Sequence, residues 1–383
     1  MQLRLSTIAC SLLAISSLDA QDYVSIQYMN YDEDSGRTTI TTPAIEFNKD
    51  FGVDYTLNVT ILQDTISGAS PTYYDASSGA SATLSNTTSY PSNIEYGDIE
   101  YEDEREAIGT MLTTRFASRD ELSVGYNYST ENDYRSHELS LEYLHYLNQS
   151  KNSSFSFGLS YQKNDVEIYC FLGTTECDSS SGASAISVEK DLDVYNFEIG
   201  YTQILDKSSL VKGSLFMVDE DGYLSNPYMR VVRDYNTSAM ITQENKPSSR
   251  RAYGATLQYD KALSNHLSSI VFYRFYDDDW DIISHTFDMK IYYTWNRLLM
   301  LGLNFRGYTQ SAASFFNARR DYFTDEVYAS SDRRVSEFSS YNYGLSCSYT
   351  ISESITFNGG IGYYEQPNYF DAFYYNVGIK YNF

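Results

Sequence analysis

Few residues of this sequence could perform acid–base catalysis. The chain has only four histidines, and one of them, in the pair Ser284-His285, follows an acidic run at 277–279. A serine, a histidine and a carboxylate can together catalyse hydrolysis, because the carboxylate orients the histidine that removes the serine proton. The segment has no nucleophile elbow. We therefore expect a rim histidine with local hydrogen bonds, no catalytic residues and no enzymatic activity.

Metal and cofactor chemistry has little support in the residue pattern. Acidic turns at 32–34 and 219–221 could hold Ca²⁺ or bridge lipopolysaccharide phosphates through divalent ions. Neither completes a twelve-residue calcium loop, so we interpret both as solvated acidic loops. The chain also lacks a Cys-x-x-Cys-His haem motif and a glycine-rich phosphate loop. We expect no metal site and no cofactor.

Cysteine chemistry points to a structural role. Cys170 and Cys177 lie seven positions apart in a Gly/Ser-rich stretch without a nearby histidine. In an exported protein this spacing favours a small disulfide loop over a metal site. Cys347 lies on the apolar face of a predicted strand, where we expect a small lipid-facing residue.

Charge selection of solutes is the remaining chemistry, and it requires charged side chains on the inner wall of a channel. The strand pattern places charges of both signs on the inward face. The alternatives are that these charges pair across the wall as structural ion pairs, or that a long loop closes the bore. The candidate lumen-lining residues are Arg115, Glu142, Glu198, Lys212, Arg274, Asp288, Lys290, Arg306 and Lys380.

These residues lie on segments in which apolar and polar side chains alternate, which is the pattern of a strand with one apolar and one polar face. We predict an even number of antiparallel strands, about sixteen, with about fourteen as the alternative. Long connections at 64–104, 163–190, 219–250 and 311–333 all fall on one side of the resulting wall. Short turns fall on the other side, which is typical of an outer-membrane β-barrel. The predicted strands are 22–31, 39–48, 53–63, 107–116, 121–129, 137–147, 154–162, 192–203, 210–218, 252–261, 266–276, 283–295, 299–305, 341–349, 355–363 and 372–383.

The last of these strands is the most clearly patterned. It resembles the closing strand of bacterial outer-membrane barrels, including the C-terminal signal that the barrel-assembly machinery recognises. We expect it to pair with the strand around 23–31 and so to remove both sheet edges. The outward residues of this signal are Tyr375, Val377, Ile379, Tyr381 and Phe383.

Composition agrees with this class of protein. Tyr is present 39 times and Phe 20 times, and these aromatics suit strands at a membrane–water boundary. The mean hydropathy of −0.42 does not oppose a membrane barrel, because only the lipid-facing half of each strand is apolar. A net charge of −24 excludes nucleic acid as a partner, since phosphates require a basic face.

The first twenty residues predict export. Residues 1–20 combine a basic start, an apolar run and a final Ala20, which indicates a signal peptide cleaved before Gln21. Lipid attachment at Cys10 is the weaker alternative, because the apolar region before it is very short. After Gln21 no apolar run reaches the roughly 20 residues of a membrane helix.

Several segments also resemble an uncharacterised bacterial family, domain of unknown function 3570. The resemblance implies an outer-membrane setting without an established activity. It also suggests a periplasmic partner, because such proteins are often encoded beside thioredoxin-like proteins and flavin transferases. The segments that carry it are 73–81, 221–228, 273–280, 284–286, 310–313 and 330–333.

The sequence thus predicts a signal peptide (1–20) followed by one transmembrane β-barrel (21–383) in the outer membrane of a Gram-negative bacterium. Its expected partners are outer-membrane lipid, lipopolysaccharide and the assembly machinery. The leading function is a porin-like or transport channel for small hydrophilic solutes. The alternative is a non-conducting scaffold or surface-interaction barrel that works with a periplasmic, redox-type partner.

Overall fold

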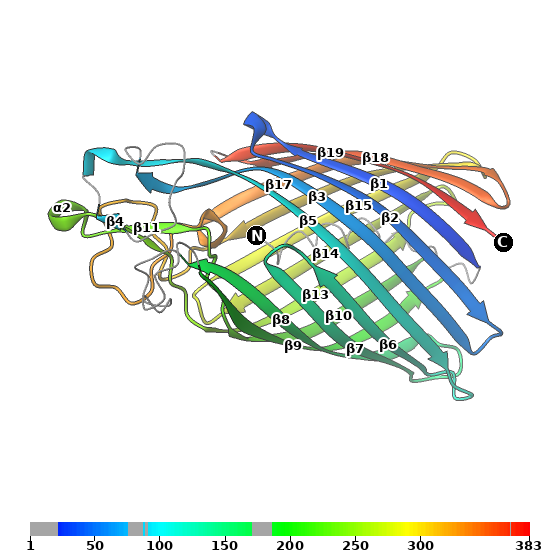
Figure 1. Ribbon diagram of the computed structural model, residues 1–383. Coiled ribbons are helices and arrows are strands. Elements are labelled where there is room, and N and C mark those ends of the chain that lie inside the picture. The colour runs from blue at the N-terminus through cyan, green and yellow to red at the C-terminus, as the bar shows by residue number, and fades with distance from the viewer. Residues whose placement is uncertain (1–21, 76–86, 89–90, 171–185, 368) are drawn as a thin grey trace.

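Sixteen antiparallel strands close into a single barrel in the computed structural model, which describes residues 22–75, 87–88, 91–170, 186–367 and 369–383. Figure 1 shows the strands tilted around one cylinder, with short turns at one end and a mass of longer segments at the other. The predicted transmembrane antiparallel barrel and its strand number are therefore confirmed. The predicted signal peptide, residues 1–20, lies outside the described residues.

Each barrel strand pairs with its neighbours in antiparallel register. The strands are β1 (Tyr23–Glu33), β2 (Thr38–Phe51), β3 (Tyr55–Asp75), β5 (Ile94–Arg115), β6 (Glu121–Thr130), β7 (Tyr134–Tyr146), β8 (Ser153–Cys170), β9 (Ile186–Asp206), β10 (Ser209–Gly222), β13 (Ser249–Ala262), β14 (Leu267–Asp278), β15 (Ile283–Thr294), β16 (Leu299–Gln310), β17 (Phe338–Ser352), β18 (Ile355–Gln366) and β19 (Phe370–Asn382).

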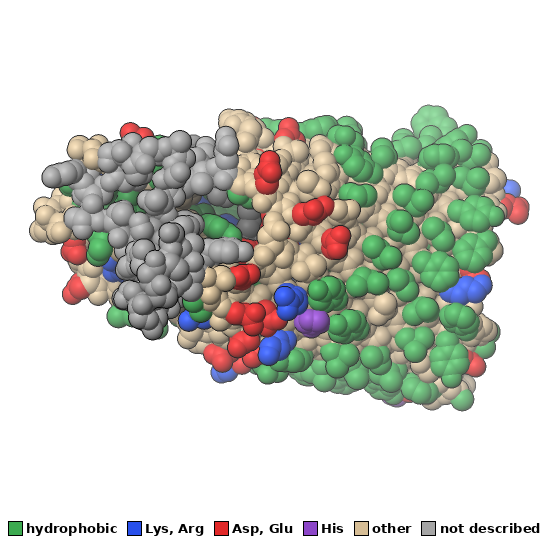
Figure 2. Space-filling model, viewed as in Figure 1, with side chains coloured by type: hydrophobic (Ala, Val, Ile, Leu, Met, Phe, Trp, Pro, Cys, Tyr) green, Lys and Arg blue, Asp and Glu red, His purple; other side chains and the backbone are tan. Residues whose placement is uncertain are grey.

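An apolar belt covers the outside of this wall. Leu303, Leu345 and Ile361 lie opposite one another on β16, β17 and β18, and each leaves about half of its surface exposed. Their polar sequence neighbours face the interior because strand side chains alternate. Figure 2 shows hydrophobic side chains gathered over the half of the barrel away from the longer segments, with acidic side chains beyond that belt. The outside of the barrel thus matches a bilayer.

The first and last strands close the cylinder. β1 pairs with β19 from Tyr23 opposite Asn382 to Glu33 opposite Ala372, so Ile26 meets Ile379. The predicted pairing of these two strands is therefore confirmed. Closure leaves neither strand with an open edge of backbone donors and acceptors.

The predicted long loop at 64–104 is wrong in its extent. β3 and β5 pair over their whole length, from Tyr55 opposite Thr114 to Asp75 opposite Ile94. A strand of 21 residues is roughly 70 Å long, far more than the roughly 30 Å hydrocarbon core. Beyond the bilayer the outward positions no longer need apolar side chains, so the alternation disappears although the strand continues.

Two smaller boundaries also differ from expectation. β8 and β9 pair as far as Cys170 opposite Ile186, so the predicted loop at 163–190 begins too early and ends too late. β2 runs through Lys49 and Asp50 to Phe51, and the turn follows at 52–54. Gly52 has a φ of +67° there, a left-handed conformation that glycine adopts without a steric penalty.

The longer segments at the outer end pack together as an outer cap, which we define as residues 223–248 and 311–337 with β4 (Thr87–Thr88). Its small sheet has the order β11 (Arg230–Arg233), β12 (Met240–Gln243) and β4. The cap also contains the short helices α2 (Tyr235–Ser238) and η5 (Arg333–Val335). The short helices η1 (Asp34–Gly36) and η3 (Pro91–Asn93) lie outside the cap. Among the described residues no helix is long and apolar enough to cross a membrane.

The structure tests only one of the two cysteine predictions. Cys347 is a free, exposed residue on β17, opposite Leu301 in the apolar belt, as expected. Cys177 lies outside the described residues, so the disulfide with Cys170 stays a prediction.

The belt predicts a position-dependent cost for charge on the outer face. Leu345→Arg, half-way along β17, should lower the free energy of unfolding from a bilayer by about 2–4 kcal/mol. Ile351→Arg, at the β17–β18 turn, is equally exposed but should cost about 0–1 kcal/mol near the interface. Urea unfolding of vesicle-folded protein measures both, and equal costs would contradict the placement of the belt.

Candidate functional site

A buried ionic cluster holds the outer cap together. Asp332 pairs with Arg334 at 2.6 Å and with Lys246 at 3.1 Å, although Lys246 is 86 positions away. Lys246 also pairs with Glu244 at 2.9 Å, and the Ser330 hydroxyl donates a hydrogen bond to Glu244. Two separate parts of the chain, 223–248 and 311–337, are fixed to each other by this cluster.

Asp332 is ionised at the centre of that cluster. Burial opposes its ionisation, but the charges of Arg334 and Lys246, together with their hydrogen bonds, hold the pKa of Asp332 well below its usual range. Removing one partner from a buried pair leaves an uncompensated charge and costs about 3–5 kcal/mol. The stability of the folded cap therefore depends on this carboxylate.

A cavity of about 390 Å³ lies between the cap and the barrel wall. This volume is within the range of small-molecule sites. Its lining comes from β1 to β3, β15 to β19 and the cap, and it contains many charged and aromatic side chains. The polar and aromatic residues that line it include Tyr31, Glu33, Arg37, Asn226, Asp288, Lys290, Tyr292, Asn304, Arg306, Asp332, Arg333, Arg334, Asn342, Tyr364, Tyr369, Phe370, Tyr374 and Asn376. We call this cavity the sub-cap pocket.

The sub-cap pocket has more positive than negative side chains. Each of its carboxylates pairs with an arginine: Glu33 with Arg37 at 3.4 Å, Asp288 with Arg306 at 2.6 Å and Asp332 with Arg334 at 2.6 Å. Two further cations line the pocket, Lys290 and Arg333. Neither forms an ion pair within the described part of the chain. The lining thus has a cationic excess inside a strongly acidic protein.

Aromatic rings hold part of this cationic lining. The Arg37 guanidinium lies 4.4 Å from the centre of the Tyr369 ring and 5.2 Å from that of Phe370. Arg333 lies 5.5 Å from the same Tyr369 ring. Cation–π contacts restrain an arginine without neutralising it. Arg333, which forms no ion pair within the described residues, can therefore still attract an anionic group.

The structure brings three of the predicted lumen-lining residues together at this pocket. Asp288 and Arg306 are directly opposite each other on β15 and β16, and Lys290 follows one inward position after Asp288. Lys290 and Arg306 remain partly exposed. Their alternation with the exposed Phe287 and Met289 places them on the inner face of the wall.

The other predicted lumen-lining residues lie elsewhere along the wall. Glu142 and Glu198 occupy the positions opposite Gly158 on either side of β8, and both are exposed although they alternate with outer-face residues. Arg115 pairs with Glu121 at 3.9 Å. Lys212 is exposed. The Arg274 guanidinium lies 4.7 Å from the centre of the Phe216 ring, and the Lys380 ammonium lies 3.9 Å from the centre of the Tyr23 ring.

The serine–histidine pair does not form a nucleophile and base. Ser284 is buried and His285 is exposed, because successive residues of β15 point to opposite faces. The Nδ1 atom of His285 forms a hydrogen bond with the Tyr273 hydroxyl at 2.7 Å. The local hydrogen bond expected for this histidine is therefore present.

Sequence reasoning missed the cap side of the pocket. Arg37, Arg333 and Arg334 line it but were not among the candidates, since they lie outside alternating strands. One available signal was the occurrence of adjacent arginines at 319–320 and 333–334 in an otherwise acidic chain.

Sequence comparison places this barrel in a family. The profile of the family described as Protein of unknown function (DUF3570) matches residues 4–376. The chain belongs to this family. The resemblance found in segments such as 273–280 is thus confirmed. No curated protein matches the DUF3570 chain.

Solved structures share its fold at low sequence identity. CdiB from Acinetobacter baumannii is 8% identical, with a TM-score of 0.52 over 95% of this chain and 60% of its own. A ferric enterobactin receptor variant, PfeA from Pseudomonas aeruginosa, is 10% identical, with a TM-score of 0.45 over 92% of this chain and 55% of its own. The CymD monoaromatic hydrocarbon channel is 8% identical, with a TM-score of 0.46 over 96% and 89%. The DUF3570 chain thus spans little more than half of PfeA, and these similarities concern the barrel fold alone.

The ionic cluster predicts acid sensitivity of the cap. The folded-state pKa of Asp332 is lowered, so its stabilisation is complete above the unfolded pKa of about 3.9 and is lost as pH falls below that value. Hydrogen exchange, corrected for intrinsic rates, should show residues 311–337 losing protection between pH 7 and pH 3.

Asp332→Asn should reduce this protection at pH 7 by about 100-fold, equivalent to about 3 kcal/mol. Asp321→Asn is the matched control in the same segment, because the pair that Asp321 forms with Arg319 is exposed. Unchanged exchange in the Asp332 variant would contradict the role of the cluster.

Proposed function

We propose that this chain is an outer-membrane channel or transporter for small hydrophilic solutes, and that the sub-cap pocket is where the solute contacts the protein. The observation that carries the proposal is the cationic excess of that pocket. It favours solutes with a negatively charged group, such as a carboxylate, sulfate or phosphate. The protein acts by passage and selection and performs no catalysis.

The inner wall supports a water-filled route. Glu142, Glu198 and Lys212 alternate with outer-face residues and are nevertheless exposed, which is consistent with open space beside them inside the barrel. A barrel of about sixteen strands is wide enough to leave an aqueous channel. Charged inner walls of this kind select ions and solutes by sign.

The pocket supplies the selection step in this proposal. Lys290 lies beside the Asp288–Arg306 pair and has no acidic partner in the described residues. An entering anion gains attraction from Lys290 and Arg333 without breaking an existing ion pair. Among the described residues that line the pocket, every carboxylate that a cation could contact is already paired with an arginine.

Lys290→Gln tests this selection. For a solute that passes about 6 Å from this side chain, removing its charge should lower the anion-to-cation permeability ratio about threefold, since the Coulomb energy at that distance in water is about 0.7 kcal/mol. Reversal potentials in planar bilayers at about 0.01 M salt measure the ratio where screening is weak. Lys207→Gln, at the β9–β10 turn, is the matched control and should leave the ratio unchanged.

Asp288→Asn should move the same ratio in the opposite direction. It leaves the Arg306 charge without its partner and should raise the anion preference about threefold by the same Coulomb estimate. If folded, heat-modifiable protein conducted no current, a non-conducting surface barrel would replace the channel proposal. Current with unchanged reversal potentials in both variants would contradict selection at the sub-cap pocket.

A further inference from the structure

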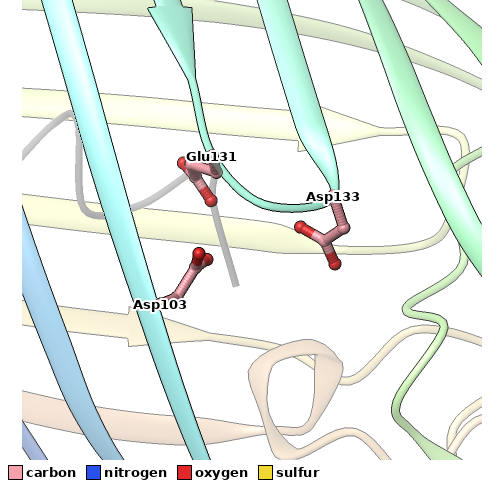
Figure 3. A group of neighbouring side chains, drawn as sticks. All are labelled: Asp103, Glu131 and Asp133. Carbon is pink, nitrogen blue, oxygen red and sulfur yellow. The ribbon is translucent and has the colours of Figure 1, made fainter.

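Three carboxylates converge at the outer rim, away from the sub-cap pocket. Asp103 comes from β5, and Glu131 and Asp133 come from the turn between β6 and β7 (Figure 3). One oxygen from each lies within 4.8 Å of the others. Two oxygens bound to one Ca²⁺ ion at about 2.4 Å can be up to about 4.8 Å apart. The spacing therefore suits a shared cation.

Asp133 supplies an independent indication that a ligand belongs there. Its side chain is only 8% exposed. One of its oxygens, Oδ2, accepts a hydrogen bond from the Tyr228 hydroxyl at 2.5 Å, but the fully buried Oδ1 has no hydrogen-bond partner among the described residues. Figure 3 shows one oxygen of this carboxylate directed toward Glu131. A buried carboxylate oxygen without a donor is costly, and a metal ion would satisfy it.

Two arginines close in sequence to this cluster form ion pairs with other carboxylates. Arg105 pairs with Asp64, and Arg135 pairs with Asp165. Backbone amides instead hold Asp103 in place: its Oδ1 accepts hydrogen bonds from the N–H groups of Glu104 at 2.9 Å and Asn132 at 3.3 Å. Neither of these two hydrogen bonds uses Oδ2 of Asp103.

We propose that Asp103, Glu131 and Asp133 form a divalent-cation site that prefers Ca²⁺ to Mg²⁺. Three carboxylates can provide several oxygens at once in the irregular geometry that Ca²⁺ accepts. Mg²⁺ requires a near-ideal octahedron and keeps most of its water. The affinity expected for such a site in an extracellular setting is about 0.1–1 mM.

The bound ion would fasten the cap to the barrel rim. It would join the extended arm of β5 to the β6–β7 turn and would fix Asp133, which holds Tyr228 of the cap. The inference does not depend on solute passage, so it stands or falls separately from the proposed function.

Titration of Ca²⁺ into the folded full-length protein tests the site. The protein is first stripped with a chelator and kept in detergent without lipopolysaccharide, at about 0.15 M salt to screen nonspecific binding. Calorimetry should show one Ca²⁺ site and little heat with Mg²⁺, and Ca²⁺ should raise the unfolding temperature. Asp133→Asn and Asp103→Asn should each weaken Ca²⁺ binding about tenfold or more.

The matched control is Asp277→Asn, which removes one exposed carboxylate of the outer rim outside the cluster and should bind Ca²⁺ like the parent protein. Heat-modifiable migration establishes that each variant is folded. Absence of Ca²⁺ binding to the parent protein would overturn the proposal. Equal binding by the parent and both cluster variants would also overturn it, because the ion would then be held by the general negative charge.

Discussion

The antiparallel pairing of β1 with β19 is the contact on which the whole molecule depends. In a bilayer, every backbone N–H and C=O group must be satisfied within the protein. Eleven residue pairs, from Tyr23–Asn382 to Glu33–Ala372, provide this at the seam. Once the wall is closed, strand alternation divides its side chains into an outer belt such as Leu303, Leu345 and Ile361 and a polar interior.

Closure also determines where selective chemistry can occur. It places Asp288 of β15 beside Arg306 of β16 on the interior, along the proposed solute route. The cap contributes Arg333 and Arg334 from the opposite side, and the buried Asp332 cluster fixes that segment. The sub-cap pocket therefore arises from two structures: a wall specified by hydrogen-bond register and a cap specified by ion pairs.

The sequence predicted the wall far better than the cap. Within the bilayer each strand has one apolar face, so residues such as Phe287 and Met289 reveal the strand and place Asp288 and Lys290 on its other face. The arms of β3 and β5 lose that signal beyond the membrane, so the sequence alone predicts a loop where the two strands pair. The Lys246–Asp332 contact joins residues 86 positions apart without any periodicity, so no local pattern could indicate it. The carboxylates of the proposed calcium site have no shared sequence pattern for the same reason, since β5 approaches the β6–β7 turn only in the folded barrel.

Solute flux into proteoliposomes is the most direct test of the central claim that the interior is a route for small solutes with a preference for anions. Vesicles containing folded, heat-modifiable protein are diluted into isosmotic solutions of a small organic anion or of a cation of similar size. The account predicts swelling faster than in protein-free vesicles, and faster with the anion than with the cation. Swelling no faster than in protein-free vesicles for either solute would contradict it.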